Sequence, residues 1–219
     1  QAGDRFGAAV DGAGDIDNDG YGDVVIGATG VDTYDAGSGN YYKDAGAVFV
    51  VEVDSGTLIA EYYNAGTKDN FGAAVAGIGD ITGDGREDVI AGAPLDDSNG
   101  KDSGSLFIMT PWNEGWHSQY VVGEAGSRLG SSAASAGDVD NDGIPDFMTG
   151  YPYGNQGAGG VRIWRGTGSS ATISFYGNIS GATAKDYSGT SVAGVADVDG
   201  DGRDDILVGS PGADVFDPV

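Results

Sequence analysis

Short apolar segments alternate with acidic, glycine-rich segments along the chain of 219 residues. One block of 24 residues occurs four times, and in each copy alternating small and apolar residues precede an acidic loop and a short apolar run. Alternation is typical of a half-buried strand, and a short apolar run is typical of a fully buried one. Each block therefore predicts two strands joined by an acidic loop. The blocks are Phe6–Thr29, Phe71–Pro94, Leu129–Pro152 and Ser188–Pro211.

The segments that separate the blocks predict a third and a fourth strand in each of the first three repeats, whereas the last repeat has two strands. The polar segment Val31–Asp44 is expected to be a surface loop. In chain order, the predicted strands are Phe6–Gly14, Asp23–Ala28, Gly46–Val53, Thr57–Tyr63, Phe71–Gly79, Asp88–Ala93, Gly104–Thr110, Gln119–Gly123, Leu129–Gly137, Asp146–Gly150, Gly160–Arg165, Ala171–Tyr176, Ser188–Ala196 and Asp205–Gly209.

The acidic loops carry oxygen donors at positions 1, 3, 5, 7 and 9, counted from the first Asp of each loop. Position 7 offers its backbone carbonyl, and a glycine at position 6 permits the sharp turn that directs the donors inward. Ca²⁺ takes roughly six to eight oxygen ligands at about 2.3–2.6 Å. We therefore predict one Ca²⁺ in each of the four loops. The predicted ligands are Asp15, Asp17, Asp19, Tyr21 and Asp23; Asp80, Thr82, Asp84, Arg86 and Asp88; Asp138, Asp140, Asp142, Ile144 and Asp146; and Asp197, Asp199, Asp201, Arg203 and Asp205.

Two other interpretations of these loops fit the sequence less well. Asp, Asn and Gly are ordinary turn residues, but four copies in one register crowd carboxylates that repel one another without a cation. An EF-hand loop needs a Glu at position 12. The residues at that position are Ile26, Ala91, Thr149 and Val208. Asn18 and Asn141 lie at position 4 and are expected to shape the turn, and Thr82 makes the second loop the weakest predicted site.

Phe71-Gly72 before the second loop and Gly92-Ala93-Pro94 after it resemble the FG-GAP repeat, which is known from the β-propeller of integrin α subunits. The other copies read Phe6-Gly7 with Gly27-Ala28-Thr29, Leu129-Gly130 with Gly150-Tyr151-Pro152, and Ser188-Gly189 with Gly209-Ser210-Pro211. The resemblance covers nearly the whole chain. It implies an all-β fold of four-stranded antiparallel blades, with a cation in the loop between the first two strands. It also implies an extracellular protein concerned with adhesion.

On this resemblance the chain is a single FG-GAP repeat domain over residues 1–219, with repeats at about 1–65, 66–124, 125–183 and 184–219, the last of them truncated. About three and a half blades are present, so the β-propeller ring is expected to be incomplete in this chain. Open repeats with exposed strand edges associate readily. We therefore expect a longer chain, or a tandem or filamentous assembly that forms by self-association through the open blade edges.

The formal net charge of −24 argues against nucleic acid or an anionic membrane as a partner. There is no cysteine, so disulfides do not stabilise the fold. No apolar run approaches the roughly 18 residues of a membrane span, so we expect no membrane insertion. Weak all-oxygen Ca²⁺ sites fill outside the cell, where the ion is plentiful. We expect a secreted or cell-surface protein with a protein or glycan ligand at the cell surface or matrix.

Other functions stay open on the sequence. A carbohydrate-binding, lectin-like propeller is the main alternative, through grooves between blades or through Trp112, Trp116 and His117, although such a cluster is more often a packed hairpin tip. A carbohydrate-active enzyme domain is less expected, because there is one His and no paired-acid or Ser/His/Asp constellation outside the loops. We predict no enzymatic activity. Asn178 begins an N-glycosylation sequon that is compatible with a surface turn.

Overall fold

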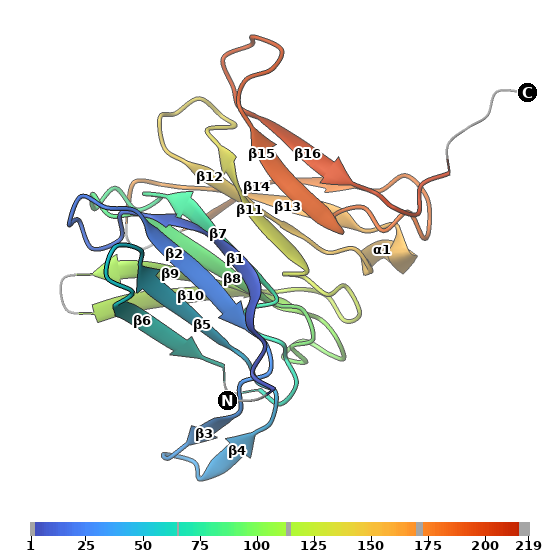
Figure 1. Ribbon diagram of the computed structural model, residues 1–219. Helices are drawn as coiled ribbons and strands as arrows, with labels where there is room; N and C mark the ends of the chain where they lie inside the picture. The colour runs from blue at the N-terminus through green and yellow to red at the C-terminus, as the bar shows by residue number, and fades with distance from the viewer. Residues whose placement is uncertain (1–2, 65, 113–114, 170–172, 215–219) are drawn as a thin grey trace, which may run out of the picture.

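The computed structural model describes residues 3–64, 66–112, 115–169 and 173–214. These residues form three antiparallel sheets of four strands, a sheet of two strands and a small hairpin (Figure 1). The predicted all-β fold of four-stranded antiparallel blades is confirmed, and the described residues close no ring. No helix within these ranges is long and apolar enough to cross a membrane.

Each blade takes its strands in chain order. Blade 1 comprises β1 (Phe6–Gly14), β2 (Asp23–Ala28), β5 (Ala47–Glu52) and β6 (Leu58–Tyr63); blade 2 comprises β7 (Ala74–Gly79), β8 (Asp88–Ala93), β9 (Ser105–Trp112) and β10 (Gly115–Val122); blade 3 comprises β11 (Ser132–Gly137), β12 (Asp146–Gly150), β13 (Gly160–Arg165) and β14 (Ser174–Ser180); and blade 4 comprises β15 (Ser191–Val195) and β16 (Asp205–Gly209). A short helix, α1 (Gly154–Gly157), lies between β12 and β13.

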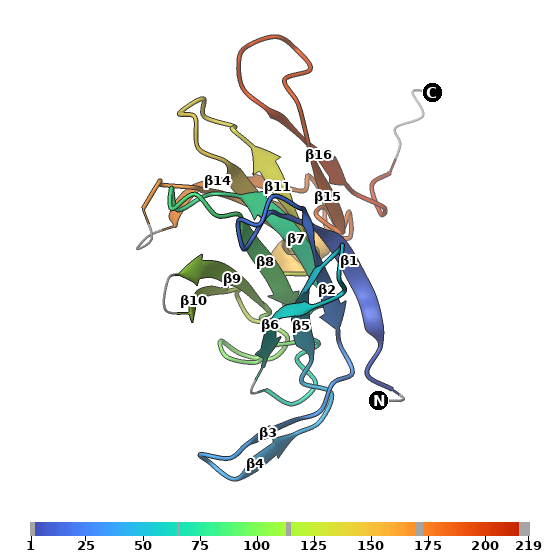
Figure 2. The same cartoon turned by 60° about the vertical axis from the view of Figure 1, so that its left-hand side comes forward.

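The first strands of successive blades pack side by side, β1 against β7, β7 against β11 and β11 against β15 (Figures 1 and 2). This is the expected position for the strands with the smallest side chains. A Cβ atom added to Gly77 of β7 would lie 2.2 Å from the carbonyl oxygen of Gly12 in β1. Larger side chains fill the space between the blades farther out, where Ile90, Leu106 and Trp164 belong to one buried cluster of blades 2 and 3.

The glycines of the FG-GAP signature form the joint between neighbouring blades. A Cβ atom added to Gly92 would lie 2.0 Å from the carbonyl oxygen of Gly130 in the next blade, which leaves no room for any side chain. The same approach, at 1.9 Å, joins Gly27 to Gly72 and Gly150 to Gly189. Gly130 also has a φ of 85°, a conformation that favours glycine. The FG of one repeat and the GAP of the repeat before it are therefore two halves of one contact.

The positive φ of the FG glycine also explains why three first strands begin later than predicted. Gly72 has a φ of 83°, and Ala73 donates a hydrogen bond of 3.0 Å to the carbonyl of Asn70, so the chain turns before β7 begins at Ala74. The equivalent turns precede β11 and β15. Blade 1 has the same turn, with a φ of 84° at Gly7, but there Phe6 still pairs with Ala28, so the strand keeps its predicted bounds Phe6–Gly14 and the turn appears as a shift in pairing between Phe6 and Ala9.

Three local expectations were wrong. The segment Val31–Asp44, expected to be a loop, contains the hairpin of β3 (Thr33–Asp35) and β4 (Asn40–Tyr42), because Tyr and Thr pair well across strands. The outer strand of blade 2 is longer than Gln119–Gly123 because β10 begins at Gly115 and pairs with β9 throughout. Asn178 lies on strand β14, not in a turn, because β14 continues to Ser180. The tip 113–114 and the side chains of Trp112, Trp116 and His117 lie outside the described residues.

Candidate metal centres

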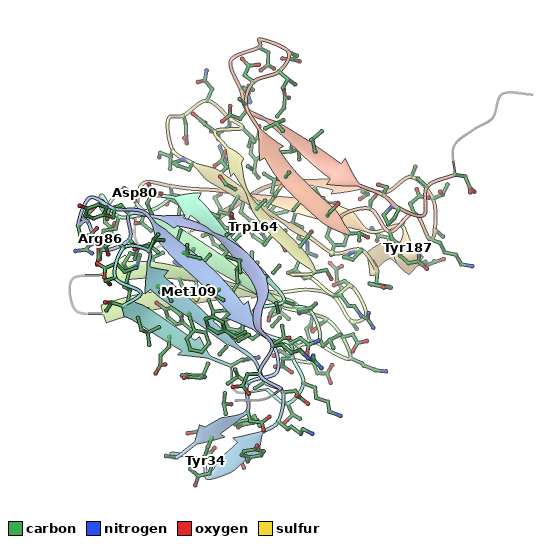
Figure 3. The ribbon with its side chains drawn as sticks, viewed as in Figure 1. Tyr34, Asp80, Arg86, Met109, Trp164 and Tyr187 are labelled. Carbon is green, nitrogen blue, oxygen red and sulfur yellow. The ribbon has the colours of Figure 1, made fainter. Side chains whose placement is uncertain are left out.

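The four acidic loops connect the first two strands of each blade, and all lie at the same end of the sheets, at the top and upper left in Figure 1. They thus occupy one rim of the molecule, away from the hairpin β3–β4. Asp80 and Arg86 of the second loop mark this rim in Figure 3, and Tyr34 marks the hairpin.

All four loops share one hydrogen-bond scheme, although their sequences differ. The carboxylate at position 1 accepts hydrogen bonds of 2.8–3.2 Å from the backbone N–H groups of positions 5 and 6. The carboxylate at position 9 accepts a bond of 2.9–3.0 Å from the N–H of position 2. These bonds fold each loop around its own acids, including the second loop, where Thr82 replaces an Asp.

Two residues with positive φ allow each loop to turn this tightly. The glycine at position 6 has φ between 86° and 96° in all four copies. Position 4 is also left-handed, with φ of 63° at Asn18 and 61° at Asn141, and the other two loops have Gly83 and Gly200 there. Asn is among the few residues with a side chain that tolerates this conformation. The predicted turn-shaping role of Asn18 and Asn141 is confirmed.

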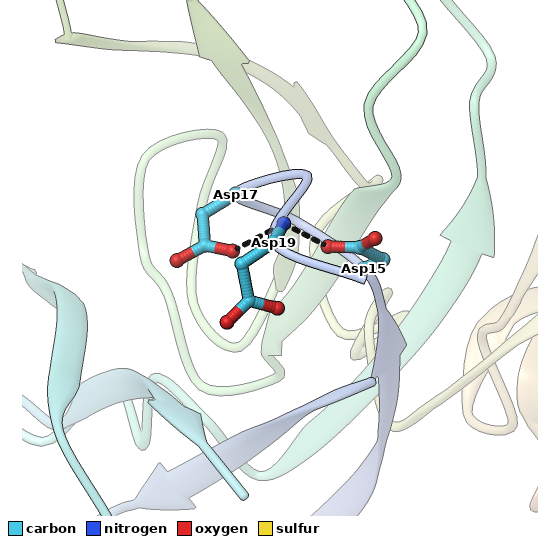
Figure 4. A group of neighbouring side chains, drawn as sticks. All are labelled: Asp15, Asp17 and Asp19. Carbon is cyan, nitrogen blue, oxygen red and sulfur yellow. Dashed lines mark hydrogen bonds between the residues drawn. The ribbon is translucent and has the colours of Figure 1, made fainter. Parts of the chain in front are cut away.

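Three of the loops bring three carboxylates together, with one oxygen from each within 4.8 Å of the others. Figure 4 shows the first of these clusters and the bonds from the Asp19 N–H to Asp15 and Asp17, at 3.0 and 3.2 Å. The three clusters are Asp15, Asp17 and Asp19; Asp138, Asp140 and Asp146; and Asp197, Asp199 and Asp205. Among the described residues the second loop forms no such cluster, which agrees with its expected weakness.

Buried carboxylate oxygens without partners indicate that these loops fit a cation. Oδ1 of Asp23, of Asp88 and of Asp140 is buried and accepts no hydrogen bond within the described residues. Burial first, and the charges of the neighbouring loop carboxylates second, raise the pKa of Asp88 to about 8 and that of Asp146 to about 6. A buried carboxylate is stable when it is paired or when it coordinates a metal. An all-oxygen donor set of this kind suits a hard divalent cation.

The sequence did not reveal Arg165 as part of the third loop. Arg165, at the end of β13, donates through Nη1 to Oδ2 of Asp140 at 2.6 Å. Arg165 pairs across the strands with Asp146, at the place where Glu52 pairs with Asp23 in blade 1. A basic residue on the third strand of a blade, paired with the Asp at position 9, is thus the sequence signal that would have identified Arg165.

Adjacent loops also contact one another. The carboxylate of Asp204, at position 8 of the fourth loop, accepts hydrogen bonds from the N–H groups of Asp138 at 2.9 Å and Asp197 at 3.2 Å. Arg86 of the second loop donates to the carbonyl of Ile16 in the first loop at 3.1 Å. Sequence reasoning considered only the carbonyl of position 7 and not the side chains at positions 7 and 8. The first loop is therefore joined to the second, and the third loop to the fourth.

Comparison with known proteins agrees with this architecture. The family "FG-GAP-like repeat" matches residues 138–208, and the family "FG-GAP repeat" matches residues 71–109. Integrin alpha-4 of Xenopus laevis is 29% identical over 178 residues, which cover 77% of this chain and 17% of that protein. Integrin alpha-7 of Mus musculus is 33% identical over 174 residues, 75% of this chain and 14% of that protein. The chain thus spans less than a fifth of either relative. Repeated blades, glycine joints and matching families together show that the chain belongs to the FG-GAP repeat family of integrin α-like proteins.

Proposed function

We propose that the chain is an extracellular Ca²⁺-binding repeat module with an adhesive or structural role, and that it has no enzymatic activity. The observation that carries the Ca²⁺ proposal is the set of buried, unpartnered carboxylate oxygens in loops that already share one fold. The four Ca²⁺ sites and the predicted ligands, including the carbonyls of Tyr21, Arg86, Ile144 and Arg203, are part of this proposal.

When bound, Ca²⁺ supplies positive charge and coordination that offset the repulsion of the clustered acids. The chain's own residues hold the loops ready for it. Asp15 and its equivalents use both oxygens on backbone N–H groups, which fixes the turn. Asp23 and its equivalents connect the end of the loop to its beginning. Because Arg86 and Asp204 connect neighbouring loops, ordering one loop favours order in the next.

The test is Ca²⁺-dependent stability. Because four sites bind the folded state, removing Ca²⁺ with EDTA should lower the melting temperature by about 10 °C or more. Calorimetric titration of the Ca²⁺-free protein should give four binding events. In the Asp80→Asn variant, the weakest of these events, assigned to the second loop, should disappear. Asp54→Asn, which removes an exposed acid in a hairpin turn outside the loops, is the matched control and should leave the titration unchanged. An unchanged melting temperature in EDTA would contradict the proposal.

The adhesive part of the proposal is supported by the family membership and the acidic rim. It predicts binding to purified matrix or cell-surface proteins immobilised on a sensor, and binding should disappear in EDTA and return with Ca²⁺. Failure to bind any protein of such a panel, with Ca²⁺ sites filled, would leave the structural role and remove the adhesive one.

A specific observation also favours self-association. Gly209 of blade 4 holds the position at which Gly27, Gly92 and Gly150 meet the next blade, but its nearest contacts are with Ser191 of its own sheet. Leu207 of β16 is 60% exposed, and Phe6 of β1 is 61% exposed at the opposite end of the row of blades. We propose that these two faces dock a second copy head to tail. Sedimentation should show concentration-dependent oligomers that Leu207→Asp abolishes, and a monomer at every concentration would contradict this.

A further inference from the structure

A cavity of about 320 Å³ lies on the face of blade 3, beside blade 2. Its floor is formed by Trp164 of β13, which belongs to the buried cluster shared by the two blades and lies within the ribbon in Figure 3. Its walls come from β14, from Tyr151 after β12 and from Glu124 after β10. The volume is at the lower end of the roughly 300–1,000 Å³ found for small-molecule sites.

Two cross-strand rows build this cavity. Trp164 pairs with Phe175 and Arg162 pairs with Asn178, and residues two apart on β13 lie on one face. The pairing skips Tyr176 between these rows, which is a β-bulge. The bulge places Phe175 and Asn178, three residues apart, on the face of the cavity. Bulges commonly re-aim side chains beside binding sites.

The polar groups of the cavity are already arranged by contacts with one another. Arg162 donates to Oε1 of Glu124 at 2.7 Å, and its guanidinium lies 5.4 Å from the centre of the Tyr151 ring. The Tyr151 hydroxyl donates to Oδ1 of Asn178, whose Nδ2 donates to Ser180 at 2.9 Å. The side chain of Arg162 is 18% exposed and that of Glu124 is 70% exposed, so the donor is fixed and its partner faces solvent.

The aromatic groups of the lining supply an apolar surface beside these donors. The rings of Trp164 and Phe175 meet edge to face, with centroids 5.5 Å apart and planes at 75°. Phe175 is 54% exposed, so much of its ring is free to stack against a ligand. One aromatic face beside amide, carboxylate and guanidinium groups matches the two sides of a sugar ring, which carries apolar C–H groups on its faces and hydroxyls around its edge.

We propose that this cavity binds a neutral pyranose sugar unit. Within the described lining, the charge of Arg162 is balanced by Glu124, so the cavity carries no net charge that would select an ion. The net charge of −24 further disfavours an anionic ligand. The ring stacks on Phe175, while Asn178, Glu124 and Arg162 bond its hydroxyls. None of the predicted Ca²⁺ ligands is among the described residues that line this site.

The experiment titrates ¹⁵N-labelled protein, made in a host without N-glycosylation and saturated with Ca²⁺, with methyl glycosides of neutral hexoses and N-acetylhexosamines. Binding in the millimolar range should move the indole N–H signal of Trp164 and the backbone signals of Arg162 and Asn178. Phe175→Ala should weaken binding at least tenfold. The matched control is Tyr63→Ala, which removes a 51% exposed aromatic from the fourth strand of blade 1, where Tyr63 meets Phe49 edge to face.

Each outcome decides the proposal. Localised shifts with a neutral glycoside, together with loss in Phe175→Ala and retention in Tyr63→Ala, support it. If no neutral glycoside moves these signals, if only uronic acids do, or if both variants lose binding equally, the assignment of a neutral sugar site is overturned. The shift mapping on the unaltered protein keeps the test valid even where Phe175→Ala fails to fold.

Discussion

The joints between blades and the rim of acidic loops lie in the same repeats, but different forces hold them. At a joint, a glycine such as Gly92 packs directly on the backbone of the next blade, and no charge is involved. At the rim, carboxylates such as Asp88 are buried with an oxygen that has no hydrogen-bond partner among the described residues. One region thus depends on close packing within the chain itself, whereas the other would depend on a cation under the proposed function. The difference teaches that loss of Ca²⁺ should loosen the rim before the row of blades comes apart.

The largest effect is expected at a joint. Gly92→Ala places a methyl group 2.0 Å from a backbone oxygen, so it should destabilise the protein by about 3 kcal/mol or more, equally with and without Ca²⁺. Urea unfolding in Ca²⁺ and in EDTA measures this. Gly209→Ala is the matched control, since its Cβ would meet chiefly the Ser191 side chain, and it should cost far less. Equal costs for both would show that the joints do not hold the blades.

A substitution in a loop, unlike one at a joint, should destabilise the protein by an amount that depends on Ca²⁺. Asp138→Ala removes the acceptor for the N–H groups of Asp142 and Gly143 and one carboxylate of a cluster. We expect a loss of about 2–3 kcal/mol in Ca²⁺ and a smaller loss in EDTA, where only the hydrogen bonds disappear. The same unfolding experiment measures both, and a loss of equal size in the two conditions would argue against a metal at this loop.

Asp69 lies two residues before the Phe71-Gly72 pair of a joint, and it tests whether electrostatics also contribute to stability near the joints. Burial, and then the charge of Asp96, raise the pKa of Asp69 to about 6. Because the folded-state pKa lies above the unfolded value, the folded state binds the extra proton, and stability should fall as pH rises from about 4 to 6. Asp69→Asn should remove up to about 2 kcal/mol of this decline, and unfolding measured across that pH range in Ca²⁺ checks it. A slope that persists in the variant would assign the dependence to other acids.

The smallest effect is expected at Arg165. Its side chain is 40% exposed and that of Asp140 is 8% exposed, so solvent partly screens the pair. Arg165→Met should cost less stability than the substitutions above, and it should cost more in EDTA than in Ca²⁺, where the cation compensates the Asp140 charge. Arg128→Met removes a pair with Asp102 in a connection away from the rim and should show no Ca²⁺ dependence. A Ca²⁺-independent loss at Arg165 would remove it from the third site.

The repeated block made most of the fold predictable. Strands such as β2, β8 and β16 have the expected bounds. Each is a short continuous apolar run between an Asp and a Gly, and such a run is typical of a fully buried strand. The hairpin β3–β4 was missed because its residues are polar and its stability comes from cross-strand pairing, which composition does not show. Arg165 and Asp204 were missed for a related reason, since their partners lie 25 and 66 residues away. The predicted ligand set itself stays a prediction.

The hairpin β3–β4 extends from blade 1 at the end opposite the acidic rim, and Tyr34 and Tyr41 on it are more than 60% exposed (Figure 3). Its turn, which includes Gly37 and Gly39, contacts no other blade in the views of Figures 1 and 2. The 24-residue blocks are equal in length, whereas the spacers differ, so the fold already accepts extra length in this connection. A foreign peptide, a fluorophore or an affinity tag inserted at this turn should therefore leave the architecture intact and give a handle for attaching the module to a surface.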